Sequence, residues 1–145
     1  MDEAHLRQVL PDYDIVIDAT DQLENKFLIN DVCVSAEKPF VHGGITGFSG
    51  QVMTYVPEKG PCYRCIFGEV PEDNAPAPIP VIGVTAGIIG TIQAAEAIRY
   101  LLGIPSLLTG KLLVLDGLRM QFRTVPFPHV SEHCPLHTRK GVTDL

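Results

Sequence analysis

The stretch Asp14-Ile15-Val16-Ile17-Asp18-Ala19, residues 14–19, decides how this sequence is expected to fold. A short run of β-branched residues of this kind is typical of a buried parallel strand. Thr20 and Asp21 end the strand, and a helical pattern then extends from about Gln22 to Ala36. Pro39 cannot continue that helix, because it has no N–H to donate. The stretch therefore predicts a strand–helix unit.

The rest of the sequence alternates between strand-like and helix-like segments. A second strand is expected to begin at Phe40-Val41 and to end in His42-Gly43-Gly44. Further strands are expected at Gln51–Val56, Lys111–Asp116 and Met120–Val125. A long helix is expected from Val84 to Leu102, and a proline-rich loop over residues 69–80. The alternation predicts an α/β fold: a Rossmann-like mixed sheet with flanking helices and antiparallel pairing late in the chain. We expect residues 1–145 to form a single domain.

The composition narrows the classes of function. With 46% hydrophobic and 19% charged residues, the chain of 145 residues has the make-up of a soluble globular domain. The net charge of −6 argues against a nucleic-acid partner. The helix over 84–102 contains Gln93, Glu96 and Arg99, so no membrane span is expected. Since no apolar leader opens the sequence and the cysteines have metal-ligand spacing, we expect a cytoplasmic protein.

Two short motifs far apart in the sequence have the spacing of metal ligands. Cys62 and Cys65 form a CxxC motif, and Cys134 and His137 form a CxxH motif. Two such pairs supply the four ligands of a closed, structural zinc site, which would join residue 62 to residue 137. The alternative is a redox CxxC motif with an unrelated cysteine and histidine.

Small residues recur along the long helix at Gly83, Gly87, Gly90, Ala94 and Ala97. Such a stripe lets another backbone approach closely. We expect it to pack on the sheet, and a subunit interface between two copies of the chain is the alternative. Both arrangements are compatible with a homodimer, which we also expect.

Polar residues at the expected strand ends are candidates for a ligand site, because open parallel sheets bind ligands at the carboxyl ends of their strands. Asp21 can cap the following helix or hold a magnesium ion beside a nucleotide phosphate. Lys26, about one turn later, can reach a phosphate or lie on a solvated face. His42 is assigned to the core or to a strand end and not to a catalytic base.

Five segments in order resemble the ThiF/MoeB/HesA family, the bacterial relatives of ubiquitin-activating enzymes. They are DATDQLENKFLINDVC (18–33), KPFVHGGITGFSGQV (38–52), CYRC (62–65), GIIGTIQAAEAIRYLLG (87–103) and KLLVLDG (111–117). The resemblance implies an ATP- and magnesium-dependent adenylyltransferase. Its partner would be a ubiquitin-like sulfur-carrier protein, whose C-terminal glycine is activated for thiamin or molybdopterin synthesis.

The resemblance also implies roles for individual residues. Asp21 matches the aspartate that supports magnesium and ATP, while Lys26 and Gln22 stand where the family usually has arginine and asparagine. The family's zinc site has two CxxC pairs, and His137 replaces the last cysteine here. Because histidine also binds zinc, we expect the metal to be retained.

Two features of the family are not found in this sequence. Residues 1–13 contain no glycine-rich nucleotide loop, so the chain resembles the C-terminal half of an adenylation domain: a fragment, a split gene product or a proteolytic remnant. Residues 69–83 contain no cysteine for a covalent step, and Cys33 is expected to be a buried structural thiol. The alternative functions are a non-catalytic zinc-stapled module that binds the carrier protein, and a redox protein using Cys62 and Cys65.

Overall fold

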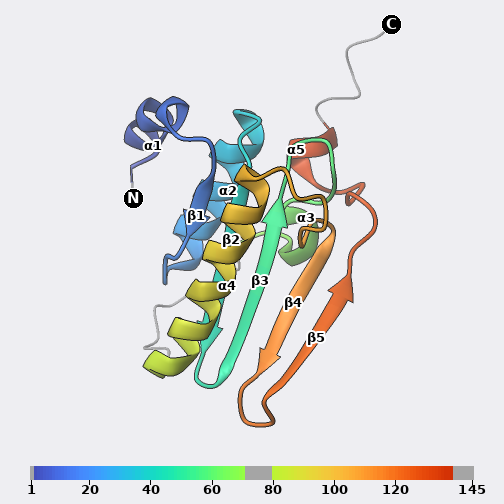
Figure 1. The fold of residues 1–145 in the computed structure, drawn as a ribbon. Coiled ribbons are helices and arrows are strands. Elements are labelled where there is room, and N and C mark those ends of the chain that lie inside the picture. The colour runs from blue at the N-terminus through green and yellow to red at the C-terminus, as the bar shows by residue number, and fades with distance from the viewer. Residues whose placement is uncertain (1, 71–79, 139–145) are drawn as a thin grey trace, which may run out of the picture.

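A five-stranded mixed sheet forms the centre of the computed structural model, which describes residues 2–70 and 80–138 (Figure 1). The strands lie in the order β1 (Val16–Asp18), β2 (Phe40–Thr46), β3 (Ser49–Tyr55), β4 (Lys111–Asp116) and β5 (Gln121–Pro126). β1 is parallel to β2, and every later pair is antiparallel. The expected mixed α/β sheet is therefore confirmed. Most of the expected loop over 69–80 lies outside the described residues.

Helices flank the sheet on both faces. The α-helices are α1 (Glu3–Val9), α2 (Leu23–Ser35), α3 (Tyr63–Phe67), α4 (Gly83–Leu101) and α5 (Pro135–Thr138), and a 3-10 turn, η1, spans Leu10–Asp12. α4 crosses β2 and β3 on the near face in Figure 1, whereas α2 contacts β1, β2, α3 and α5. Among the described helices, none combines the length and hydropathy of a membrane span.

The alternation of side chains along β2 divides the apolar core into two clusters. Phe40 packs with residues of α2 and α3, and the next residue, Val41, packs with Ile89 of α4 on the opposite face. Successive side chains of a strand point to opposite faces, so one strand contributes to both clusters. Cys33 belongs to the first cluster and is fully buried, as expected for a structural thiol.

β2 extends to Thr46, beyond the Gly43-Gly44 pair at which the sequence predicted it to end. The reason is a close approach between layers: a Cβ on Gly43 would lie 2.4 Å from the side chain of Gln93 on α4. The missing side chain therefore makes room for a polar helix residue directly above the strand. This glycine serves packing and not a turn.

The small-residue stripe of α4 does not pack on the sheet, which corrects the favoured expectation. Gly83, Gly87, Gly90 and Ala94 are exposed, and of the five small residues only Ala97 is buried. The sheet-facing side of the helix instead carries larger side chains, at Thr85, Ile89, Gln93 and Glu96. These residues fill the space over β2 and β3, so the small residues face outward.

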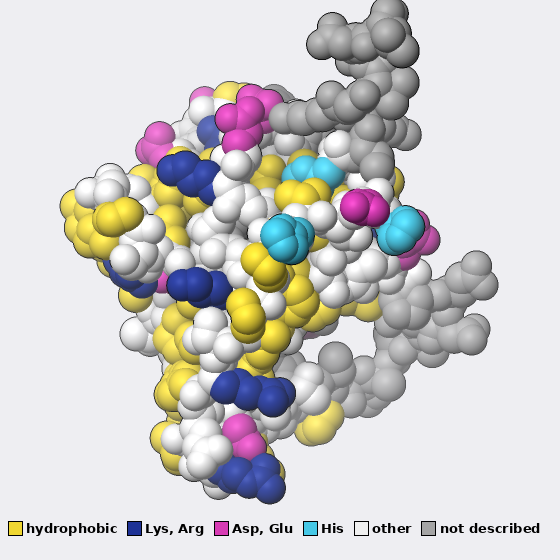
Figure 2. Space-filling model, turned by 90° about the vertical axis from the view of Figure 1, so that its right-hand side faces the viewer, with side chains coloured by type: hydrophobic (Ala, Val, Ile, Leu, Met, Phe, Trp, Pro, Cys, Tyr) yellow, Lys and Arg dark blue, Asp and Glu magenta, His cyan; other side chains and the backbone are white. Residues whose placement is uncertain are grey.

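The β4–β5 hairpin leaves an apolar groove beside α4. The groove has a volume of about 550 Å³ and is lined by Val84, Gly87, Ile88, Thr91, Ile92 and Phe122. On the side of the molecule seen in Figure 2, lysine and arginine side chains lie among hydrophobic ones. Arg119 and Phe122 belong to this hairpin and are exposed.

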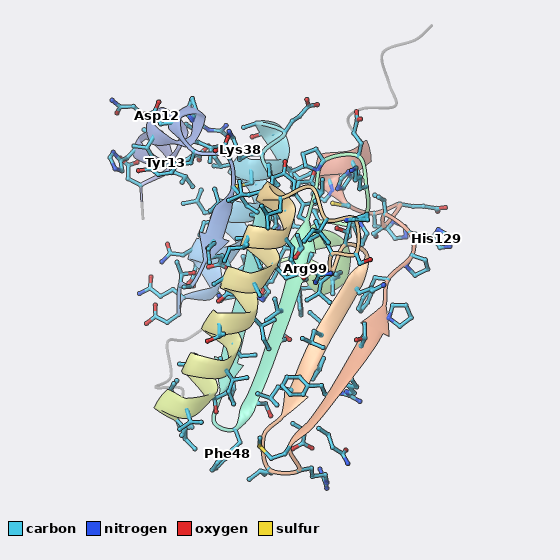
Figure 3. All side chains as sticks on the ribbon, viewed as in Figure 1. Asp12, Tyr13, Lys38, Phe48, Arg99 and His129 are labelled. Carbon is cyan, nitrogen blue, oxygen red and sulfur yellow. The ribbon has the colours of Figure 1, made fainter. Side chains whose placement is uncertain are left out.

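Phe48, at the tip of the β2–β3 hairpin (Figure 3), accepts a hydrogen bond through its carbonyl from Gly117 N–H at 2.9 Å.

Candidate metal cluster and strand-end site

The four predicted metal ligands converge, although 72 residues separate Cys62 from Cys134. Cys62 immediately precedes α3, and the CxxC spacing brings Cys65 back to the same side of that short helix. Cys134 precedes α5, which carries His137. One ligand atom from each residue lies within 4.8 Å of all the others.

The geometry of the cluster fits a tetrahedral zinc ion. The Sγ of Cys62 lies 3.7 Å from the Sγ atoms of both Cys65 and Cys134. Sulfurs bound to one zinc at 2.3 Å in a regular tetrahedron would be about 3.8 Å apart. His137 adds a second indication, because its Nε2 is a buried polar atom with no hydrogen-bond partner among residues 2–70 and 80–138. A metal would satisfy this nitrogen, whereas a redox pair of Cys62 and Cys65 would leave it unexplained.

The pKa values of Cys62 and Cys65 depend on the short distance between the two thiols. A hydrogen bond from the Cys62 thiol stabilises the Cys65 thiolate and lowers the pKa of Cys65 to about 5. The same bond, together with burial, raises the pKa of Cys62. Since zinc binds thiolates, metal binding would release the remaining thiol protons.

Residues of α2 hold the cluster against the core. The side chain of Asn30 accepts a hydrogen bond at 2.8 Å from the backbone N–H of Tyr63. Arg64, between the two cysteines, makes a bidentate ion pair with Asp31 at 2.6 and 2.7 Å, and its guanidinium lies 4.8 Å from the ring centre of Phe27. The loop that carries Cys62 and Cys65 is thus fixed to the helix that follows β1.

A second polar assembly, which we call the strand-end cluster, consists of Asp18, Lys26 and His42. Asp18, the last residue of β1, is paired in register with His42 of the parallel strand β2. The Oδ2 atom of Asp18 lies 3.1 Å from Lys26 Nζ and 2.8 Å from His42 Nδ1. Asp18 and His42 are each only 1% exposed, so these charges and dipoles interact out of contact with water.

Burial and partners oppose each other in setting the pKa of Asp18. Burial alone raises this pKa, but the hydrogen bond to His42 and the charge of Lys26 outweigh it and lower the pKa to about 2. Burial lowers the pKa of both Lys26 and His42, against the opposing effect of Asp18. At neutral pH Asp18 is therefore a carboxylate, and the His42 nitrogen that faces it carries the proton.

Lys26 lies inside the protein and not on the solvated face that its isolation on a helix suggested. It is 9% exposed, and besides Asp18 it donates a hydrogen bond at 2.7 Å to the carbonyl oxygen of Gly43. Its charge also interacts with that of Asp21. Lys26 is therefore a counter-ion of Asp18 within reach of the strand ends.

Asp21 is exposed at the end of the turn that follows β1. The Oδ1 atom of Asp18 closes this turn by accepting hydrogen bonds from Thr20 N–H at 3.0 Å and from Thr20 Oγ1 at 2.7 Å. The residue that caps α2 is Gln22, and its side chain makes no capping hydrogen bond. The helix-cap interpretation of Asp21 is therefore wrong.

Sequence reasoning identified Asp21 and Lys26 and placed His42 in the core or at a strand end, and His42 is indeed buried, but it assigned no role to Asp18 or Gln93. Gln93 donates hydrogen bonds to the carbonyl oxygens of Asp18 at 2.7 Å and of Val41 at 3.2 Å, which ties α4 to both β1 and β2. The available signal was an aspartate and a histidine that each directly follow a short apolar segment, Ile15–Ile17 and Phe40–Val41. Pairing those segments as parallel neighbours would have placed the two side chains together.

A model described as the ThiF family matches residues 1–136 of the chain. The chain belongs to the ThiF family. The resemblance seen in the sequence is thereby confirmed. A SAMP-activating enzyme E1 from Haloferax volcanii is 40% identical over 151 residues, covering 100% of this chain and 54% of that protein. An adenylyltransferase and sulfurtransferase MOCS3 from Culex quinquefasciatus is 40% identical over 120 residues, covering 81% of this chain and 27% of that protein.

Solved structures support the fold of this ThiF-family chain. E. coli MccB in complex with MccA-N7isoAsn superposes with a TM-score of 0.78 at 18% sequence identity, over 94% of this chain and 43% of that one. E. coli MccB with ATP gives a TM-score of 0.76 at 21% identity. At these identities the likeness concerns the fold alone. The chain spans about half the length of the Haloferax relative and less than half of these structures.

Proposed function

We propose that this chain forms part of an ATP-dependent adenylyltransferase that activates the C-terminal glycine of a ubiquitin-like sulfur-carrier protein. The observation that carries the proposal is the 40% identity to a SAMP-activating E1 along the whole chain. The strand ends fit such a role, because the exposed carboxylate of Asp21 lies at the edge where parallel sheets bind ligands. In the proposed reaction AMP is transferred from ATP to the carrier's terminal carboxylate, and pyrophosphate leaves.

The residues divide this work between them. Asp21 would hold Mg²⁺ through its carboxylate oxygens, since hard cations prefer such ligands. Lys26 would contribute positive potential near the phosphates, while its ammonium stays bound to Asp18 and Gly43. Cys62, Cys65, Cys134 and His137 would hold structural zinc. The activated carrier protein would deliver sulfur for thiamin or molybdopterin synthesis in the cytoplasm.

Two adjoining surfaces, which share Gly87, would be available to a protein partner and to a second copy of the chain. The apolar groove beside α4 and the basic residues of the β4–β5 hairpin are open to a carrier protein. The outward stripe of Gly83, Gly87, Gly90 and Ala94 would let an equivalent helix approach closely in a homodimer. In each of these three glycines, an added Cβ would meet no atom within 4 Å.

A non-catalytic carrier-binding module is the second candidate function. The observation that favours it is the position of Lys26, whose ammonium already has two partners, Asp18 and Gly43. It therefore cannot bind a phosphate in the bidentate way that an unpaired arginine would. Such a module would bind the carrier through the same surfaces without using ATP.

ATP–pyrophosphate exchange distinguishes the two candidates. The assay would compare the chain alone with the chain fused to the preceding half of the Haloferax relative, each with a ubiquitin-like sulfur carrier. We expect exchange from the fusion, none from the chain alone, and none with a carrier that lacks its terminal glycine. Carrier binding by calorimetry without any exchange from the fusion would favour the module instead.

A further inference from the structure

We propose that Tyr63 and His42 are positioning residues that couple the cysteine–histidine cluster to the turn carrying Asp21. The chemical value of this coupling rests on the proposed function of Asp21, but the coupling itself is a property of the folded chain. Three consecutive contacts join the two places, and each involves buried groups.

The first contact fixes Tyr63 at the cluster. Tyr63 directly follows the predicted ligand Cys62, and Tyr63 itself is 3% exposed. Its backbone N–H is held by Asn30 of α2, and its ring packs on Phe67 with 4.4 Å between ring centres. Binding of a metal by Cys62 and Cys65 would fix the backbone on both sides of Tyr63, and so the direction of its ring.

The second contact passes from Tyr63 to His42. Their ring centres lie 4.6 Å apart at an interplanar angle of 59°. Phe67 contacts the same histidine, with 6.0 Å between ring centres. These rings form the wall against which the imidazole lies, so the wall limits the rotation of His42 about its side-chain bonds.

The third contact passes from His42 to the turn. Because Asp18 is a carboxylate it can only accept, so Nδ1–H of His42 donates to its Oδ2. The other ring nitrogen faces Gln51 Nε2 at 3.4 Å, which agrees with an acceptor at that position. The second oxygen of Asp18 holds Thr20 N–H and Oγ1, and Thr20 directly precedes Asp21.

A role in packing alone does not account for this arrangement. A buried imidazole loses its hydration and is stable only where its nitrogens find partners, so an apolar residue would fill the same space at lower cost. His42 is instead placed where one nitrogen orients Asp18 and the ring face meets Tyr63. A rotation of His42 would remove one of the two partners of Asp18 Oδ2 and leave Lys26 alone to orient the carboxylate that holds Thr20.

Nuclear magnetic resonance of the zinc-loaded full chain tests the proposal without ATP or carrier. The reporters are the ¹⁵N signals of the His42 ring, which distinguish its tautomers, and the amide signal of Thr20. Tyr63→Leu removes the ring on His42, Tyr63→Phe keeps it, and Phe40→Leu is the matched control. Phe40 is buried in the same cluster and stacks on Tyr55, at 5.3 Å between ring centres.

We expect Tyr63→Leu to change the His42 tautomer signature and to shift the Thr20 amide. Tyr63→Phe and Phe40→Leu should leave both reporters at their wild-type positions. Wild-type reporters in zinc-loaded Tyr63→Leu would overturn the proposal, as would equal shifts in Phe40→Leu. If Tyr63→Leu does not fold, zinc titration of the wild-type chain decides: reporters that do not respond to zinc overturn the coupling.

The result is independent of whether the enzyme proposal holds. If pyrophosphate exchange fails but the reporters respond as expected, the coupling stands and the assigned reaction falls. If exchange succeeds but the reporters do not respond, the reaction stands and the coupling falls.

Discussion

The cysteine–histidine cluster and the strand-end cluster are both polar assemblies inside an apolar core, but their polar atoms are satisfied differently. In the strand-end cluster, Asp18, Lys26 and His42 satisfy one another through hydrogen bonds of 2.8 and 3.1 Å. In the cysteine–histidine cluster, Nε2 of His137 has no partner within the described structure. The first assembly is complete within the protein, whereas the second has the geometry to hold a metal ion that would satisfy this nitrogen. The comparison therefore predicts different responses to metal, charge removal and acid.

Loss of one metal ligand should produce the largest effect. Cys134→Ala should abolish binding of one zinc per chain and cost several kcal/mol of stability, since structural zinc contributes on the order of 10 kcal/mol to folding. Metal analysis by mass spectrometry and the melting temperature check this. Cys33→Ala, at a buried thiol outside the cluster, is the control and should keep the zinc. Substoichiometric zinc that does not change in Cys134→Ala would contradict the site.

Removal of the buried ammonium should have the next largest effect. Lys26→Met leaves Asp18 without its cationic partner, and breaking a buried pair in this way costs about 3–5 kcal/mol. Chemical denaturation measures the free energy of unfolding. Adding Asp18→Asn to Lys26→Met should recover part of the loss, because the unpaired charge is then gone.

Lys38→Met is the matched control, since Lys38 donates at 2.6 Å to the carbonyl of Tyr13 and forms no ion pair with a buried carboxylate in the described structure (Figure 3). Its cost should stay near 1 kcal/mol, that of an ordinary hydrogen bond. Equal losses in the two lysine variants would mean that the Asp18–Lys26 pair contributes nothing particular.

Asp21→Asn should affect catalysis and leave stability nearly unchanged. The substitution keeps the shape of this exposed side chain but removes the charge proposed to hold Mg²⁺. Turnover of the complete enzyme should fall by roughly 100-fold, the effect of removing one preorganised electrostatic group. Asp14→Asn, at an exposed aspartate before the other end of β1, should change neither quantity. Normal adenylation by Asp21→Asn would remove Asp21 from the site.

Acid should distinguish the strand-end cluster by a smaller effect. The pKa of Asp18 is lowered from 3.8 to about 2, so its contribution to stability is present above pH ~4 and is lost as the pH falls towards ~2. The shift corresponds to about 2 kcal/mol. The difference in unfolding free energy between wild type and Asp18→Asn should shrink over that range. A difference that is constant with pH would show that the charge of Asp18 adds no stability.

The two assemblies also differ in how far the sequence predicts them. Each metal pair lies within four residues, so spacing alone indicates the ligands. The strand-end cluster is assembled by the sheet from Asp18, Lys26 and His42, and nothing local indicates that Lys26 is buried. The small residues of α4 mislead for a related reason: sequence periodicity identifies a helix face but not which element covers it. The mixed sheet with antiparallel pairing late in the chain was predicted from the alternation of segments, whereas the length of β2 depended on a contact with Gln93.

The convergence of Cys62 and Cys134 has a consequence for the order of assembly. Closing a loop of 72 residues costs roughly 4 kcal/mol of chain entropy. Pairing of β3 with β4, in which Val52 faces Leu113, already brings these parts of the chain together. The remaining closure then spans only the segments from each strand to its ligands. The segment carrying Cys134 should therefore dock after the sheet has formed. An ion that bound Cys134 before that point would have to do so without the ligands Cys62 and Cys65.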